Sequence, residues 1–167
     1  MKDVLLMNFA VDKANKKIMV EREFNAPLPL VWSAWTESEL LDQWWAPKPW
    51  QARTKSMDFT VGGHWLYGMV GPAGEEHWSR ADFKSIEFQK SYSGLDGFCD
   101  ENGNMNENMP QSLWKNEFTQ TADDTTTVNI AITYDKLEDL ETIVQMGFKE
   151  GFTAGLENLD ALFKHLV

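Results

Sequence analysis

The sequence predicts an α+β fold, and three features of the chain carry that prediction. A strand is expected at Lys17–Phe24, where apolar and polar residues alternate. About six further strand-like segments follow between residues 53 and 134, separated by turns and one polar loop. The last segment, residues 135–165, has the apolar spacing of one long surface helix. Strands in a run, with helices segregated to the ends, are typical of α+β domains with an antiparallel sheet.

Two short helices are predicted directly after the first strand. The segments LVWSAW and TESELLDQWW form them, and Thr36 with Glu39 has the capping-box spacing that starts a helix near Glu37. Pro47 and Pro49 then end the second helix, because proline cannot continue one.

The later segments pair as antiparallel strands because short turns join them. GPAGEE is a hairpin turn, residues 99–111 form a polar loop, and residues 122–124 form a second hairpin. The predicted strands are RTKSMDF, HWLYGMV, HWSRADFKSIEF with QKSYSGLDGF as one or two long strands, SLWKNEFTQT and TTTVNIAITY. With the first strand, this gives a sheet of six or seven strands.

The C-terminal helix carries three glycines on its apolar side. Asp135 and Glu138 have the capping-box spacing, and the helix is predicted to continue to about His165. Each glycine inside a helix costs about 1 kcal/mol relative to alanine. Two explanations remain open. The glycines keep a gap open between helix and sheet, with neighbouring phenylalanines as its wall, or they let the helix pack closely on a strand.

Aromatic residues on the strands are the other candidates for lining such a gap. Trp65 and Tyr67 share one face of a strand by alternation, although buried aromatics are more often simply core. Trp44, Trp45 and Trp50 are expected to anchor the loop after the second short helix, or to form the mouth of a pocket. The candidate ligand-binding residues are Gly147, Phe148, Gly151, Phe152, Gly155, Trp65, Tyr67 and Trp114.

Composition excludes several classes of function. The net charge of −11 disfavours nucleic acids and anionic membranes as partners. A single cysteine allows no disulfide within the chain, and the N-terminal residues lack the pattern of a signal peptide, so we expect a cytoplasmic protein. The 167 residues are predicted to form a single domain, either monomeric or homodimeric.

No motif for catalysis, for a cofactor or for a metal is present in the sequence. It contains no nucleophile elbow, no phosphate-binding loop and no dinucleotide fingerprint. His64 and His77 flank a hairpin, and we expect surface positions or cross-strand polar pairing for them rather than a metal site. Arg80 and Asp82 share a strand face, as a solvated pair or, if that face is concave, as polar anchors for a ligand.

Three stretches, in this order, resemble one known family. REFNAPLPLVWSAWTESELLDQWWAPKPW, FTVGGHWLYGMVGPAGEEH and MGFKEGFTAGLENLDALF are similar to the opening, the glycine-glycine strand pair and the terminal helix of the homologues of the activator of heat-shock chaperone ATPase. The likeness covers residues 17–163. It implies the helix-grip, or START-like, fold, in which a curved antiparallel sheet grips a long C-terminal helix around a cavity.

The resemblance implies three alternative functions. Stand-alone members of bacterial type resemble proteins that bind small molecules, so we expect non-catalytic binding of a small hydrophobic or aromatic ligand between sheet and helix. In eukaryotic members the domain, joined to a further N-terminal domain, stimulates the ninety-kilodalton heat-shock chaperone, which makes a chaperone the second candidate partner. Related helix-grip proteins catalyse polyketide cyclisation, which is the third alternative.

Overall fold

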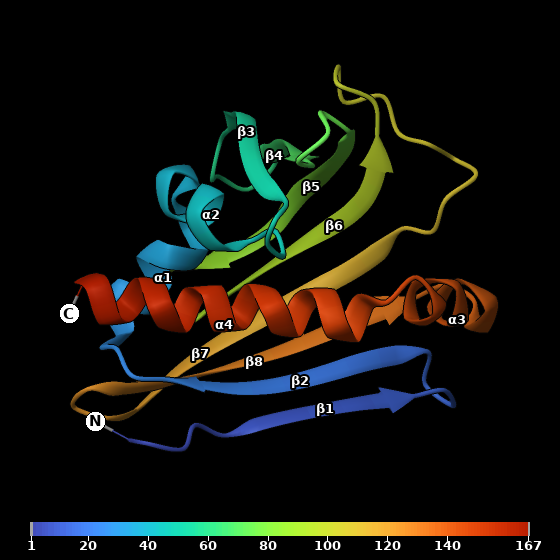
Figure 1. Ribbon diagram of the computed structural model, residues 1–167. Helices are drawn as coiled ribbons and strands as arrows, with labels where there is room; N and C mark the ends of the chain where they lie inside the picture. The colour runs from blue at the N-terminus through green and yellow to red at the C-terminus, as the bar shows by residue number, and fades with distance from the viewer. Residues whose placement is uncertain (1, 167) are drawn as a thin grey trace.

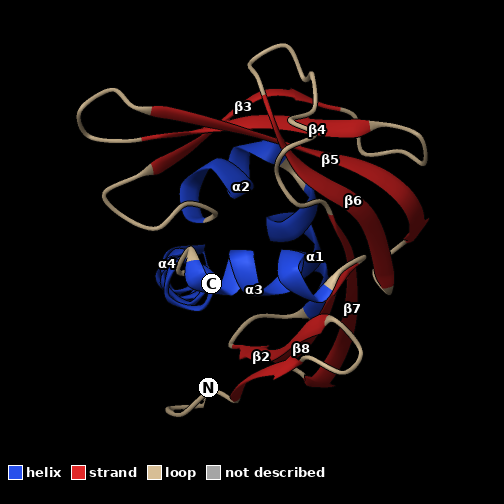
Figure 2. Ribbon diagram, turned by 90° about the vertical axis from the view of Figure 1, so that its right-hand side faces the viewer, coloured by secondary structure: helices blue, strands red, loops and turns tan. Residues whose placement is uncertain are grey.

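The computed structural model describes residues 2–166, which form one curved antiparallel sheet with helices on its concave side (Figure 1). The eight strands follow the order β1-β2-β8-β7-β6-β5-β4-β3. Figure 2 shows the sheet bent around α4, with α1 and α2 inside the same curve. The elements are β1 (Met7–Asp12), β2 (Lys17–Phe24), α1 (Leu28–Thr36), α2 (Ser38–Trp44), β3 (Gln51–Met57), β4 (His64–Val70), β5 (Glu76–Glu87), β6 (Ser91–Cys99), β7 (Ser112–Ala122), β8 (Thr125–Tyr134), α3 (Leu137–Gln145) and α4 (Phe148–Leu166).

The predicted α+β class and the order of elements after Lys17 are confirmed, but the sheet has one strand that was not predicted. Strand β1 pairs with β2 through a tight hairpin at Lys13–Lys16. As an edge strand it buries only part of one face, with Met7 and Phe9 half-buried and Val11 exposed. Its pattern of burial is therefore too weak to stand out in the sequence.

Both predicted capping boxes are wrong, although the helices occur where they were expected. The Thr36 hydroxyl donates to the carbonyl of Trp32 inside α1, at 2.8 Å, and so does not cap α2. Glu37 and Lys136 occupy the N-cap positions of α2 and α3, and neither caps its helix with a side chain. Threonine in the last turn of α1 satisfies a carbonyl of its own helix instead.

The predicted single C-terminal helix is wrong at Gly147, where the chain breaks between α3 and α4. Gly147 has a φ of +88°, in the left-handed region that favours glycine. Such a residue commonly ends a helix, and here a new helix begins directly after it. The long C-terminal helix of the fold is α4 alone.

The C-terminal half of α4 packs tightly on the sheet and on α2. Leu156, Leu159 and Phe163 are fully or almost fully buried, and the ring of Phe163 meets that of Phe24 edge-on at 5.7 Å between centroids. The side-chain amide of Asn158 donates to the carbonyl of Ala46 at 3.0 Å, which ties α4 to the end of α2. This half of the helix therefore packs directly on the layers beneath it.

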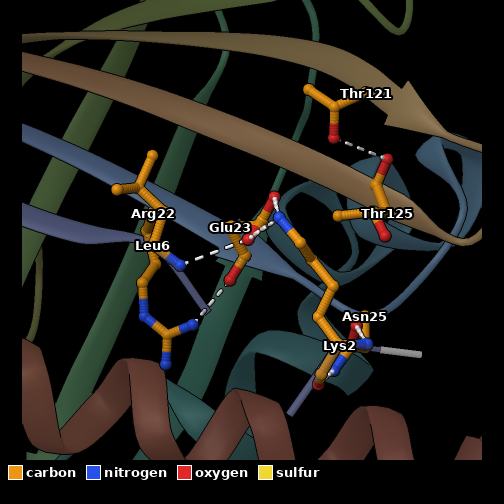
Figure 3. A network of polar contacts seen from close by, with 7 residues as sticks. All are labelled: Lys2, Leu6, Arg22, Glu23, Asn25, Thr121 and Thr125. Carbon is orange, nitrogen blue, oxygen red and sulfur yellow. Dashed lines mark hydrogen bonds and ion pairs between the residues drawn. The ribbon is translucent and has the colours of Figure 1, made fainter. Parts of the chain in front are cut away.

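Polar contacts fasten both faces of strand β2 at this packed end (Figure 3). On the concave face Arg22 forms an ion pair with Asp160 of α4. On the opposite face the Lys2 ammonium donates to both carboxylate oxygens of Glu23, at 2.9 and 2.8 Å. The backbone N–H of Leu6 donates to the same carboxylate, so the chain before β1 covers Glu23.

Candidate ligand cavity

A cavity of about 270 Å³ lies between the N-terminal half of α4 and the concave face of the sheet. Strands β4 to β7, helix α3 and the loop after α2 complete its walls. The lining residues are Trp45, Pro47, Tyr67, Met69, His77, Ser79, Asp96, Gly97, Phe98, Pro110, Ser112, Trp114, Ile143, Phe148, Gly151 and Phe152. Most of this wall is apolar, as is typical of sites for small molecules.

Aromatic rings from α4, from the loop after α2 and from the sheet form a continuous part of the cavity wall. Phe148 and Phe152 stack one turn apart on α4, with centroids 5.3 Å from each other. Trp114 of β7 meets Phe152 edge-on at 5.6 Å, and Trp45 lies 5.8 Å from Trp114. The indole N–H of Trp45 donates to the Tyr67 hydroxyl at 3.0 Å, which fixes the position of both rings.

The structure brings five of the eight predicted site residues together at the cavity. Tyr67, Trp114, Phe148, Gly151 and Phe152 all line it. The other three predicted residues, Trp65, Gly147 and Gly155, lie outside its wall. Trp65 stacks on Tyr67 at 3.9 Å between centroids and donates to Thr54, so it supports the wall from beside it.

The three glycines of the C-terminal segment have three different surroundings. A Cβ atom at Gly151 would meet only Cγ of Pro47 within 4 Å, at 3.9 Å. At Gly155 the same atom would lie 3.1 and 3.3 Å from the carbonyl oxygens of Trp45 and Trp44. Gly147 forms the helix break. A Cβ atom at Gly151 has open space beside the cavity, and one at Gly155 is closely packed. At Gly147 a Cβ atom would meet nothing within 4 Å, and the positive φ is what favours glycine there.

Asp96 of β6 is a lining residue that the sequence reasoning missed. It faces the concave side because Tyr92, Gly94, Asp96 and Phe98 alternate along the strand. This alternation was visible in SYSGLDGF and would have placed one acid among apolar and small residues. Burial, and to a lesser degree the charge of Asp82, raises the pKa of Asp96 well above its ordinary value.

The tyrosines near Asp96 remain neutral. Burial raises the pKa of Tyr67, Tyr92 and Tyr134, with the Asp96 carboxyl adding to the effect on each. The Tyr92 hydroxyl donates to the carbonyl of Trp35 at 3.2 Å. These phenols serve as hydrogen-bonding groups and not as bases near neutral pH.

His64 and His77 do not face each other, because the register of β4 and β5 separates them. His64 is opposite Asp82 and hydrogen-bonds Ser56 at 3.1 Å, while His77 is opposite Met69 and lies against Trp50. Within residues 2–166, no group of three His, Cys, Asp or Glu side chains converges as a metal site would require.

Arg80 and Asp82 pair with each other on the convex face of β5. Their side chains lie 2.9 Å apart and are about one-third exposed, on the face opposite the buried Ala81 and Phe83. The solvated-pair interpretation of the sequence therefore describes them, and neither side chain enters the cavity.

The curved sheet around α4 and the cavity between them define the class of the protein as helix-grip, or START-like. The chain matches the family described as activator of Hsp90 ATPase homolog 1-like protein over residues 25–164, and it belongs to that family. No protein with a curated description matches it significantly. No helix within residues 2–166 has the length and apolarity that crossing a bilayer requires.

Solved structures share this architecture along nearly the whole chain. A crystal structure of a Mycobacterium smegmatis protein is 29% identical, with a TM-score of 0.86, and the alignment covers 95% of this chain and 96% of that one. A solution structure from Arthrobacter aurescens is 27% identical, with a TM-score of 0.88 and coverage of 95% and 91%. The AHSA1 protein of Silicibacter pomeroyi, at 18% identity, shares the fold, with a TM-score of 0.72 and coverage of 90% and 99%.

Proposed function

We propose that the protein binds a small apolar or aromatic molecule, without transforming it, in the cavity beneath the N-terminal half of α4. The observation that carries this proposal is the cavity itself, walled by Phe148, Phe152 and Trp114 and bordered by the bare backbone of Gly151. Filling such a cavity removes apolar surface of both partners from water, which favours binding by roughly 25 cal/mol per Å².

The size and the polar groups of the cavity limit the kinds of ligand that it can hold. Its volume of about 270 Å³ is near the lower end of ligand sites, which hold roughly 300–1,000 Å³. We therefore expect a compact ring system and not a long lipid chain. The described lining residues offer Asp96, His77 and three hydroxyl groups, and no hydrogen bond joins them as a nucleophile and its base.

A fluorescence titration with N-phenyl-1-naphthylamine, a neutral aromatic probe, tests this proposal. We expect the wild-type protein to bind the probe, and Gly151→Phe to lower the affinity at least about tenfold, because the new ring occupies the cavity. Glu157→Phe is the matched control, since it places the same ring on an exposed position of the same helix. It should bind the probe as the wild-type protein does.

Two results would contradict the proposal. If Gly151→Phe is folded by circular dichroism and binds as tightly as the wild type, the probe lies elsewhere. If Gly151→Phe fails to fold, Ile143→Trp narrows the cavity from α3 and takes its place. Unchanged binding by that variant contradicts the proposal equally.

Stimulation of a chaperone ATPase is the second candidate function, because the matching family is described as homologues of such an activator. We expect purified chain to leave the ATPase rate of the ninety-kilodalton chaperone unchanged at saturating concentration. Acceleration that persists in Gly151→Phe would instead support an activator that works independently of the cavity.

A further inference from the structure

Asp96 is an acid in the wall of an apolar cavity with no partner of opposite charge. Among the residues that the structure describes, its carboxyl group takes part in no hydrogen bond and no ion pair. The lining contains no Lys or Arg. The nearby guanidinium of Arg80 is held on the convex face by Asp82, at 2.9 Å. A buried acid without a partner destabilises the folded protein unless a ligand supplies that partner.

The titratable groups that act on the charge of Asp96 are three buried tyrosines and a second acid, and no base is among them. Tyr67 of β4, Tyr92 of β6 and Tyr134 of β8 are the tyrosines, and His77 of β5 lines the same cavity. Asp82 of β5 is the second acid and acts from the convex face of the sheet. This environment repels an anionic ligand. It favours a ligand that brings positive charge, and the net charge of −11 attracts such ligands toward the protein.

The aromatic rings that line the cavity with Asp96 suit the same kind of ligand. Rings of Trp45, Tyr67, Trp114, Phe148 and Phe152 line the cavity together with Asp96. The face of each ring carries negative partial charge and attracts a cation within about 6 Å of its centroid. Aromatic rings around one carboxylate form the arrangement that binds ammonium groups in proteins.

We propose that the cavity takes an organic cation, a protonated amine or quaternary ammonium on a compact apolar body, with Asp96 as its counter-ion. This inference rests on the proposed function, since it names the chemical class of the molecule bound there. Because the pKa of Asp96 is raised in the free protein, part of the free protein carries a proton on this carboxyl group. When the ligand binds, its ammonium group keeps its proton, and a protonated Asp96 releases its proton to the solvent.

Isothermal titration calorimetry with three probes that share an indole body tests the charge preference. Tryptamine is the cation, tryptophol the neutral molecule and indole-3-acetate the anion. We expect tryptamine to bind about tenfold tighter than tryptophol, and indole-3-acetate to bind more weakly than both. In Asp96→Asn the preference for tryptamine over tryptophol should disappear. Titrations of the wild type in two buffers should also show proton release with tryptamine only.

Three outcomes would overturn the inference, and they are distinguishable from failure of the proposed function. Tryptophol binding as tightly as tryptamine would remove the cation preference. A preference for tryptamine that survives in folded Asp96→Asn would assign the charge recognition to another group. Binding of the neutral naphthylamine probe without any binding of tryptamine would leave a cavity for uncharged ligands. Failure of every probe, the naphthylamine included, would overturn both proposals.

Discussion

Gly151 and Gly155 lie one turn apart on the same face of α4, yet their surroundings are opposite. At Gly155 the carbonyl oxygens at the end of α2 come within 3.1 Å of where a Cβ atom would be. At Gly151 the nearest atom is a proline carbon at 3.9 Å, and the space beyond belongs to the cavity. Glycine therefore occurs at these two positions for different reasons: it permits close packing at Gly155 and borders the cavity at Gly151.

The difference between the two glycines shows that the position of α2 sets how far the cavity extends along α4. Helix α2 lies inside the curved sheet beside the C-terminal half of α4, as Figure 1 shows. Beyond Trp45 the chain leaves α2 and turns outward through the loop at Pro47, so the N-terminal half of α4 lacks that neighbour. Aromatic side chains from both layers border the space but do not fill it.

Leucine substitutions at the two glycines should give the largest contrast. We expect Gly155→Leu to lower the free energy of unfolding by about 3 kcal/mol, because rigid backbone carbonyls occupy the space that the side chain needs. Gly151→Leu should change it by no more than about 1 kcal/mol, since helix propensity improves and the cavity receives the side chain. Urea denaturation followed by circular dichroism measures both.

Equal losses of stability in the two variants would break the comparison. Such a result would mean that α4 is closely packed along its whole length. A loss confined to Gly151→Leu would contradict it more strongly, because it would reverse the two environments.

Asp96→Asn should stabilise the folded protein, because the Asp96 carboxyl group in the cavity wall destabilises it at neutral pH. The pKa of Asp96 is raised in the folded state, so its contribution to stability is fully present below the pKa of the unfolded chain and is lost as pH rises through the folded pKa. We therefore expect Asp96→Asn to raise the free energy of unfolding at pH 7 by roughly 1–3 kcal/mol. The gain should shrink to nothing below about pH 3.5.

A stability of Asp96→Asn that equals the wild type at every pH would contradict this prediction. Asp82→Asn is the control, because Asp82 is paired with Arg80 on the convex face. Since this carboxyl has a partner of opposite charge, its removal should not stabilise the protein at pH 7.

The sequence predicted the parts of this structure that periodicity and order determine. Alternation located β2, and the apolar face of residues 148–163 located α4. The edge strand β1 was missed, because an edge strand buries too little to show a pattern. The break at Gly147 was missed as well, because a glycine inside a helical pattern does not reveal its own φ angle.

The candidate site was only partly predictable, for a reason of the same kind. Phe152 and Tyr67 could be proposed from their type and position, but the separation of Gly151 from Gly155 depends on where α2 ends in space. Asp96 could have been found, because its strand places an acid on a face of small and aromatic residues.

Of these variants, Lys2→Met should change the free energy of unfolding least. It tests a polar contact at the closely packed end of the molecule. The hydrogen bond from Lys2 lowers the pKa of Glu23, whose contribution to stability is therefore present above its unfolded pKa and is lost as pH falls through the folded pKa. The Lys2 side chain is 54% exposed, so we expect a loss of at most about 1 kcal/mol at pH 7. Below about pH 3 the variant and the wild type should be equally stable.

Thermal unfolding across this pH range measures the effect. A difference between Lys2→Met and wild type that persists unchanged at low pH would show that the lysine acts through packing. Affinity for the naphthylamine probe should be unchanged, because neither Lys2 nor Glu23 lines the cavity.

A crystal structure of the protein with N-phenyl-1-naphthylamine tests the central claim most directly. We expect electron density for the probe between Tyr67 and Phe152, with its rings against Trp114 and the backbone of Gly151. An interior closed by the protein's own side chains, with Phe148 and Trp114 rotated into the space and the probe bound elsewhere or not at all, would contradict it.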